Sequence, residues 1–305
     1  MEGSVHPVFR SRLVQAGFAI LACFSLLAIC APWLTRTHLL KSPVQQDLAG
    51  LDESGMPLPP AMGYLLGTDQ LGRDVLSRVI FGGRVSLTLG VASMLVATGI
   101  GVSVGLISGY YGGRLDQVLM RFTEINLTIP AILLAIAFAS LMDGRVLHLH
   151  PPGWGGHFLD VRMERGLTSL FVLIGFVCWP GMVRVIRAQV LTVREREYVL
   201  ASRVLGASDA RILLTHILPG VLPIVIVLAA MTTASTITLE AGLGYLGVGV
   251  PPPSPSWGSM IAEGQEYFLA APILVIAPGL AIVFTVLALN LLAQGLQEAL
   301  QIEQR

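Results

Sequence analysis

Six long stretches of the chain are apolar and contain no Asp, Glu, Lys or Arg. They cover residues 13–34, 85–113, 125–142, 166–183, 212–239 and 267–297. Each meets or approaches the ~20 residues that a helix needs to cross the hydrocarbon core of a bilayer. They are too long and too evenly apolar for the alternating strands of a barrel, and backbone groups in hydrocarbon must be paired within their own segment. The pattern therefore predicts an all-α polytopic membrane protein with six transmembrane helices.

Composition supports this prediction and excludes an aqueous globule. Hydrophobic residues make up 54% of the 305 residues and charged residues only 12%, and the mean hydropathy is +0.74. The first apolar stretch reaches spanning length and lacks a clear small-residue cleavage site. We therefore expect it to be an uncleaved membrane helix and not a signal peptide.

The distribution of arginine predicts the orientation of the spans. Arginines crowd residues 184–211, between the fourth and fifth stretches, whereas residues 240–266 contain no Lys or Arg. The positive-inside rule places the arginine-rich connection in the cytoplasm, and with six spans both termini are then cytoplasmic as well. The first connection argues against this orientation, because it carries four arginines and Lys41 on the predicted outer side.

The first connection ends in a segment with helical spacing. Thr68 and Asp69 are suited to cap a helix, and apolar positions between residues 71 and 79 recur at helical intervals. We predict a short amphipathic helix before the second span, which lies in the membrane interface, contacts a soluble partner or covers the pore entrance. Residues 1–84 would then form an N-terminal helix and outer loop, and residues 85–305 a transmembrane domain with a cytoplasmic loop at about 188–216.

Glycines suggest one helix contact and one turn. Gly101, Gly105 and Gly109 fall at four-residue steps in the second span, which lets another helix approach closely. The segment from Gly242 to Gly247 fits the G-x-G-x-x-G pattern, but no strand precedes it and prolines follow it. We expect an interfacial or re-entrant turn on the outer side there instead of a dinucleotide site.

Catalytic and metal-binding patterns are weak. Lys41 is the only lysine, so the chain has no G-x-x-x-x-G-K-[ST] phosphate loop, and we expect neither ATP hydrolysis nor a cofactor in it. His148, His150 and His157 lie in an outward-facing connection without Cys. A solvated loop is favoured there over a transition-metal site.

The predicted spans contain only neutral polar groups in their interiors, such as Asn290 and Gln294, with Glu240 near an outer end. Secondary transporters commonly bury ionisable groups at that depth for ion coupling. If the chain takes part in transport, we therefore expect the energy to come from other subunits.

Several separated blocks of residues, each weak alone, are specific in combination. They are Gly67-Thr-Asp69, Gly72-Arg-Asp74, Gly109-Tyr-Tyr-Gly-Gly113, Arg194-Glu-Arg-Glu-Tyr198, Gly206-Ala-Ser-Asp209, His216-Ile-Leu-Pro219, and Tyr245-Leu-Gly-Val-Gly249 with Trp257. From about Gly67 to its end the chain resembles the inner-membrane permease subunits of bacterial binding-protein-dependent ABC importers. The resemblance is to the second permease of the dipeptide, oligopeptide and nickel group.

The resemblance implies that the cytoplasmic loop forms a coupling helix that docks on an ATPase. The family's motif begins Glu-Ala-Ala, where this chain has Leu200, Ala201 and Ser202, so the usual Glu is missing. Small side chains permit close approach by a partner, and Gly206 can take an open backbone that turns the chain. The residues expected to couple to the ATPase are Glu197, Leu200, Ala201, Ser202, Gly206, Ala207 and Asp209.

The resemblance also implies an outer face that flanks the translocation path. The residues expected there are Gly67, Asp69, Arg73, Asp74, Glu240 and Trp257. The implied partners are a homologous second permease, two ATPase subunits that bind ATP and Mg²⁺, an extracytoplasmic solute-binding protein and the lipid bilayer, with no nucleic acid. The expected cargo is a dipeptide or oligopeptide. The alternatives are a nickel or metal-complex importer and an integral membrane metal-dependent enzyme.

Overall fold

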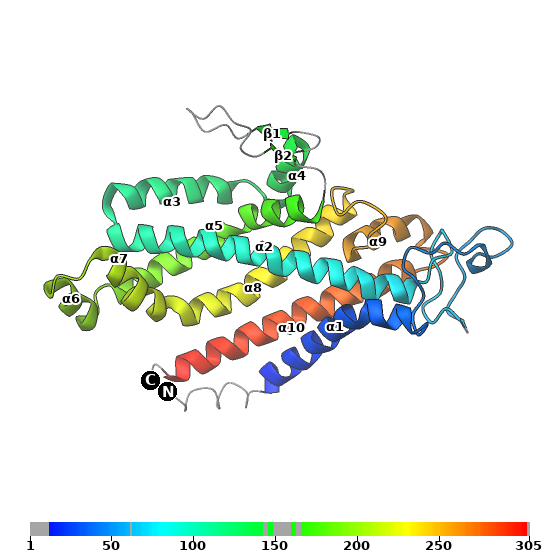
Figure 1. Cartoon of the computed structure of the whole chain (residues 1–305), viewed down its shortest axis with the longest axis horizontal. Coiled ribbons are helices and arrows are strands. Elements are labelled where there is room, and N and C mark those ends of the chain that lie inside the picture. The colour runs from blue at the N-terminus through cyan, green and yellow to red at the C-terminus, as the bar shows by residue number, and fades with distance from the viewer. Residues whose placement is uncertain (1–11, 62, 143–145, 149–159, 163–165, 304–305) are drawn as a thin grey trace.

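Long helices lie side by side along the molecule in a computed structural model that describes residues 12–61, 63–142, 146–148, 160–162 and 166–303 (Figure 1). The five long helices are α1 (Arg12–Arg36), α2 (Val75–Tyr111), α5 (Leu167–Val193), α8 (Leu218–Tyr245) and α10 (Ile273–Glu303). The shorter helices are α3 (Gly113–Thr128), α4 (Ala131–Met142), α6 (Glu197–Val204), α7 (Asp209–Ile212) and α9 (Trp257–Gly264). Single helical turns cover Leu48–Gly50, Leu213–Ile217 and Gln265–Tyr267.

The helices agree with the predicted number of spans. Among the described residues, five helices are long and apolar enough to cross a membrane, and the count is six if the bent pair α3 and α4 forms one span. The expected all-helical membrane fold is confirmed. A pair of three-residue strands, β1 (Val146–His148) and β2 (Asp160–Arg162), forms a small antiparallel hairpin between α4 and α5.

The third span differs from its prediction as one continuous helix over residues 125–142. Helix α3 ends at Thr128, Ile129 is extended, and α4 starts at Ala131 after a bend of 93°. Pro130 accounts for the break, because proline has no N–H to donate and disfavours helical geometry at the residue before it. The apolar pattern continues across Pro130 and therefore concealed the bend.

The second span also begins differently. The separate amphipathic helix and its cap at Thr68 and Asp69 are wrong, because one helix starts at Val75 and continues for 37 residues to Tyr111. Asp74 caps this helix by accepting a hydrogen bond from the Ser77 amide at 2.9 Å. The residues on either side of position 84 therefore share one helix.

The glycines at four-residue steps form a close contact between two helices, as predicted. An added Cβ would lie 3.0 Å from the Met182 side chain at Gly101, 2.8 Å from Ile186 at Gly105, and 2.7 Å from Val190 at Gly109. All three partners lie on α5. We call these three residues of α2 the glycine seam, and it holds α2 and α5 together at a distance that larger side chains would prevent.

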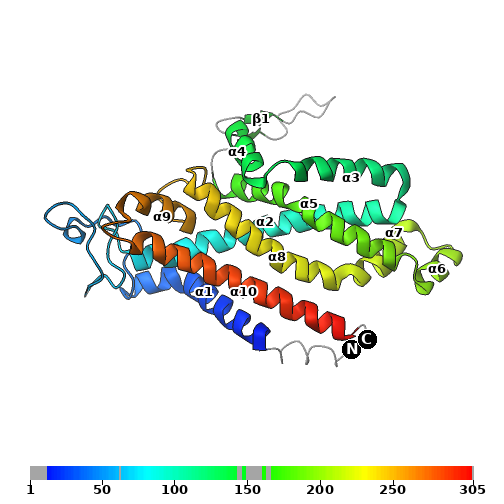
Figure 2. The ribbon, with the colours of Figure 1, turned by 180° about the vertical axis from the view of Figure 1, so that it is seen from behind.

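The two ends of the bundle carry different structures. The start of α1 and the end of α10 point toward the end where α6 and α7 lie (Figure 2), which agrees with an even number of crossings. At the opposite end, residues 37–74 form an irregular cap, and α9 packs against α8 and α10. The G-x-G-x-x-G segment ends α8 in a turn at Gly247, with φ +77°, and no nucleotide-binding strand precedes it.

Candidate functional site

The segment from α6 to α7, which we call the α6–α7 loop (residues 197–212), projects from one end of the bundle between α5 and α8 (Figure 1). Gly206 lies between the two short helices with φ +81°, a backbone conformation that side-chain-bearing residues rarely adopt. The expected turn at Gly206 is present. The turn lets α6, which follows α5, and α7, which leads into α8, lie at the same end of the bundle.

Buried contacts fix the base of this loop. Val199 and Ile212 are fully buried in a cluster with residues of α5 and α8. The Tyr110 hydroxyl at the end of α2 donates a hydrogen bond to Asp209 Oδ1 at 2.6 Å. The guanidinium of Arg203 lies over the ring of Tyr110, 5.5 Å from its centre. The loop is therefore attached to α2 as well as to the helices that precede and follow it.

Apolar side chains are exposed at the tip of the loop. Val204 is 87% exposed, Leu205 86% and Leu200 45%. Water exposure of three neighbouring aliphatic side chains on a projecting loop is typical of a surface that another protein covers. The tip is therefore a candidate docking surface.

The other residues predicted for this loop fall into two groups. Glu197 and Ala201 are exposed on α6 beside the tip, and Ala207 is half-buried against the core. Ser202 and Asp209 make contacts within the chain: the Ser202 hydroxyl lies 3.1 Å from His216 Nε2 and donates to the Tyr198 carbonyl, while Asp209 accepts from Tyr110. These two side chains position the loop from within.

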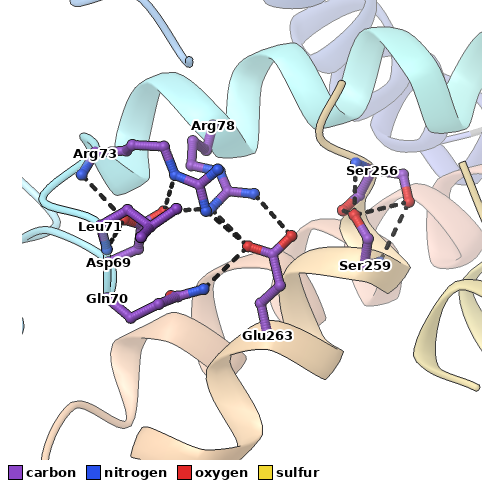
Figure 3. A network of polar contacts seen from close by, with 8 residues as sticks. All are labelled: Asp69, Gln70, Leu71, Arg73, Arg78, Ser256, Ser259 and Glu263. Carbon is purple, nitrogen blue, oxygen red and sulfur yellow. Dashed lines mark hydrogen bonds and ion pairs between the residues drawn. The ribbon is translucent and has the colours of Figure 1, made fainter. Parts of the chain in front are cut away.

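At the opposite end of the bundle, four charged side chains form a network that we call the charge cluster: Asp69, Arg73, Arg78 and Glu263 (Figure 3). Asp69 and Arg78 are each only 4% exposed. The cluster joins the residues that precede α2, the first turn of α2, and α9. Two guanidinium groups face two carboxylates, so the formal charges balance.

Asp69 and Glu263 accept the hydrogen bonds of the charge cluster. Asp69 Oδ1 accepts from the amides of Leu71 and Arg73 at 2.9 and 3.0 Å, and its Oδ2 accepts from Arg73 Nε at 2.6 Å and from Arg78. Glu263 accepts from Arg73 at 2.8 Å and from Arg78 at 2.9 and 3.2 Å. Burial opposes ionisation of Glu263, but the hydrogen bonds and charges of the two arginines outweigh it and hold the pKa of Glu263 below its usual value.

Arg78 and Glu263 were not among the predicted site residues. Arg78 stands on the apolar-periodic segment after Asp74, and Glu263 lies 185 residues away, in a connection without Lys or Arg. A sequence signal did exist, because that connection has acids without basic residues while the first connection has several arginines. Charge balance could have predicted that the two connections lie together. It could not have identified which residues form the ion pairs.

The remaining residues predicted for the outer face are buried and make contacts within the chain. Trp257 fills the space beside Gly82 and Gly83, and its Nε1 donates to the Val79 carbonyl at 2.9 Å. Glu240 is 1% exposed and accepts a hydrogen bond from the Ser86 hydroxyl at 2.9 Å. These side chains fasten α2, α8 and α9 together.

Two other positions of the predicted outer face complete this end. Gly67 takes a turn with φ +76° before the charge cluster. Asp74 is the cap of α2, and burial holds its pKa above the usual value although the Ser77 amide opposes this.

The three histidines of the connection that was expected to be a solvated loop fall largely outside the described residues. His148 lies on β1, whereas His150 and His157 are not described. Across the ranges that the structure does describe, no group of three His, Cys, Asp or Glu side chains is placed to hold a metal ion.

Comparisons with known proteins agree with the fold. Residues 101–303 match the family described as "Binding-protein-dependent transport system inner membrane component". The dipeptide transport system permease protein DppC of Haemophilus influenzae is 36% identical over 297 residues, covering 95% of this chain and 90% of that protein. The oligopeptide transport system permease protein OppC of Bacillus subtilis is 34% identical over 293 residues, covering 96% and 86%. A chain of the MetNI methionine ABC transporter in an inward-facing conformation has a TM-score of 0.56 at 18% identity, covering 73% of this chain and 97% of that chain.

Proposed function

Because the chain belongs to the binding-protein-dependent transport system inner membrane components, we propose that it is a permease subunit of an ATP-driven importer whose cargo is peptides. It is a multi-pass protein of the bacterial inner membrane. Two relatives of similar length are named for dipeptide and oligopeptide transport, and these names support peptides over nickel as the cargo. The chain supplies half of the path, and a homologous second permease supplies the other half.

The α6–α7 loop carries this proposal. Its base is buried and hydrogen-bonded, while Leu200, Val204 and Leu205 are exposed at its tip. The apolar tip can bind a partner subunit, and the rigid base can transmit a movement of that partner to the helices of the bundle. The partner is an ATPase, since the chain itself has no phosphate-binding loop, and ATP and Mg²⁺ bind in two such ATPase subunits.

The same loop continues directly into a span. The helical chain runs unbroken from Asp209 through the turn at Leu213–Ile217 to Tyr245, 37 residues in all. A movement of the loop therefore acts directly on the start of α8, because no loop residues separate the two. The Tyr110–Asp209 hydrogen bond passes part of the same motion to α2. Closure of ATPase subunits on ATP thereby shifts the spans between two arrangements.

Orientation follows from the same assignment. The α6–α7 loop and both termini face the cytoplasm, where ATP is present, and the charge cluster faces outward. There an extracytoplasmic binding protein delivers the peptide. Two of the four arginines that argue against this orientation, Arg73 and Arg78, are paired with Asp69 and Glu263 in the folded chain.

A reconstituted complex tests the proposal. The chain, its second permease and its ATPases are placed in proteoliposomes containing ATP, and uptake of labelled peptides and of Ni²⁺ is measured with the binding protein outside. We expect peptide uptake that requires ATP. Uptake of Ni²⁺ without peptide uptake would overturn the cargo, and uptake that continues without ATP would overturn the mechanism.

A matched pair of substitutions tests the docking surface. Leu205→Asp places a charge on the loop tip, and Leu269→Asp does so on a leucine that is 98% exposed at the other end of the bundle. We expect Leu205→Asp alone to lose the ATPases on co-purification, because a charge at an apolar contact is left unpaired. Retention of the ATPases by Leu205→Asp would show that they dock elsewhere.

A further inference from the structure

A groove of about 480 Å³ opens between α4, α8 and α10, away from both ends of the bundle. Its polar lining residues are Ser235 and Thr238 on α8 and Asn290 on α10. None of the described residues that line it is Asp, Glu, Lys or Arg. Ser235 and Thr238 are exposed, so their hydroxyl groups are accessible from the groove.

The hydroxyl groups in this groove present acceptors. The Ser235 hydroxyl donates a hydrogen bond to the Met231 carbonyl at 3.1 Å, and the Thr238 hydroxyl donates one to the Ala234 carbonyl at 2.8 Å. Each hydroxyl oxygen keeps lone pairs that are free to accept a further hydrogen bond.

Asn290 presents both kinds of group. Its side-chain amide makes no hydrogen bond with any residue that the structure describes, although it stands within an apolar span. The amide has two donor hydrogens and an acceptor oxygen. Such a group is costly against lipid and is found where a span faces a polar path or a partner.

We propose that Ser235, Thr238 and Asn290 form a wall of the peptide path and hold the passing peptide by its backbone amide groups. The site offers acceptors for peptide N–H groups and, at Asn290, donors for peptide carbonyls. It has no charge that would favour acidic or basic side chains. The inference rests on the proposed function and adds the chemical feature of the cargo that this subunit recognises.

The apolar part of the groove fits the same role. Met231, Ile132 and Val286 line the space around the polar groups, and Met231 is 46% exposed. A flexible methionine adapts to side chains of different shape. A few neutral hydrogen bonds on an apolar wall also bind weakly enough for release, which conduction through a path requires.

Charge-matched peptides test the proposal in the complete reconstituted complex. Labelled Ala-Glu-Ala, Ala-Ala-Ala and Ala-Lys-Ala differ only in the charge of the central side chain. We expect Asn290→Leu to lower uptake of all three by the same factor, about tenfold. We expect Asn290→Asp to raise the uptake ratio of Ala-Lys-Ala to Ala-Glu-Ala by about tenfold, because it adds a negative charge in a site of low dielectric.

Two serines give a matched control. Ser103 on α2 is exposed and donates to the carbonyl four residues earlier, as Ser235 does, but it lies outside the groove. Ser235→Ala should lower uptake of all three peptides a few-fold, and Ser103→Ala should leave it unchanged.

The outcomes separate this inference from the proposed function. If the unaltered complex carries none of the peptides, both are overturned. If it carries them, and Asn290→Leu and Asn290→Asp carry them at the original rates and ratio, only the inference is overturned. Loss of the second permease on co-purification of the Asn290 variants would also overturn it, because the groove would then be a contact between subunits.

Discussion

At one end of the bundle charged side chains are buried and paired with one another, and at the other end apolar side chains are exposed. Asp69 and Arg78 are 4% exposed and form an ion pair with each other, whereas Val204 and Leu205 are more than four-fifths exposed. The charge cluster is complete in a single chain. The base of the α6–α7 loop is buried and hydrogen-bonded, whereas its tip exposes apolar side chains. We expect a partner subunit to cover the tip.

The difference indicates which end of the bundle is held rigid by contacts within the chain and which end can move when a partner binds. A buried network that binds residues 69–78 to α9 keeps that end of the bundle in one arrangement. A loop that is fixed only at its base responds to forces applied at its tip. Four experiments test this contrast, beginning with the all-or-none effect.

Labelling decides which end faces outward. Single cysteines replace Leu48, Ser254 or Val204, all exposed, in a background without the three native cysteines. A membrane-impermeant thiol reagent added to whole cells should label the first two positions and not the third until the membrane is opened. Labelling of Val204→Cys alone would invert the topology and remove the ATPase docking site.

Removing the central arginine of the charge cluster should give the largest loss of stability. Arg78→Ala leaves the buried carboxylate of Asp69 and the half-buried carboxylate of Glu263 without the arginine that bridges them, and we expect a cost of about 3–5 kcal/mol. Thermal unfolding in detergent measures it. Arg121→Ala is the control, because its ion pair with Glu124 is exposed and should contribute at most about 1 kcal/mol. Equal stability of the two variants would show that the cluster does not hold the outer end.

At the loop, backbone geometry should control transport and leave folding intact. Gly206→Pro cannot adopt φ +81° and removes the hydrogen bond that the Gly206 amide donates to the Arg203 carbonyl. We expect membrane insertion to be normal and ATP-driven uptake to be lost. Gly206→Asn is the control, since asparagine tolerates a positive φ better than other side chains, and it should retain most of the uptake. Normal uptake by the proline variant would exclude the loop from coupling.

The smallest effect concerns the missing acid. Leu200→Glu restores the residue that the resemblance places at the start of the coupling motif. Leu200 is 45% exposed, and an exposed ion pair contributes only about 0.2–1 kcal/mol. We expect uptake within a few-fold of the unaltered complex. A large gain in peptide-stimulated ATPase activity would show that charge, and not apolar packing, dominates at the tip.

The sequence predicted the spans because hydrophobic length is a strong and local signal. It predicted the glycine seam for a similar reason, since four-residue spacing places Gly101, Gly105 and Gly109 on one face. Pro130 lies inside the third apolar stretch, and the apolar residues around it continue the pattern of a single span. The 93° bend depends on packing that the pattern does not contain.

Long-range charge pairing was the main feature that the sequence could not predict. Asp69 was expected to cap a helix, but its carboxylate accepts hydrogen bonds from a turn and from two arginines. Glu263 has no local pattern that distinguishes it from a solvated acid. Glu240 and Trp257 lie at the same end of the bundle as the charge cluster, and their burial follows from the packing of α9.

The unbroken length of α2 has a consequence for insertions and deletions. With 37 residues at 1.5 Å each, the helix is about 55 Å long, well beyond the ~30 Å of the bilayer core. It carries Arg78 near one end and Tyr110 near the other, with the glycine seam in its second half. One residue inserted between Arg78 and the seam would rotate the two parts by about 100° relative to each other, so that one of the two contacts would face the wrong way. We therefore expect α2 to accept substitutions far more readily than changes of length, with the irregular residues 37–74 absorbing insertions in its place.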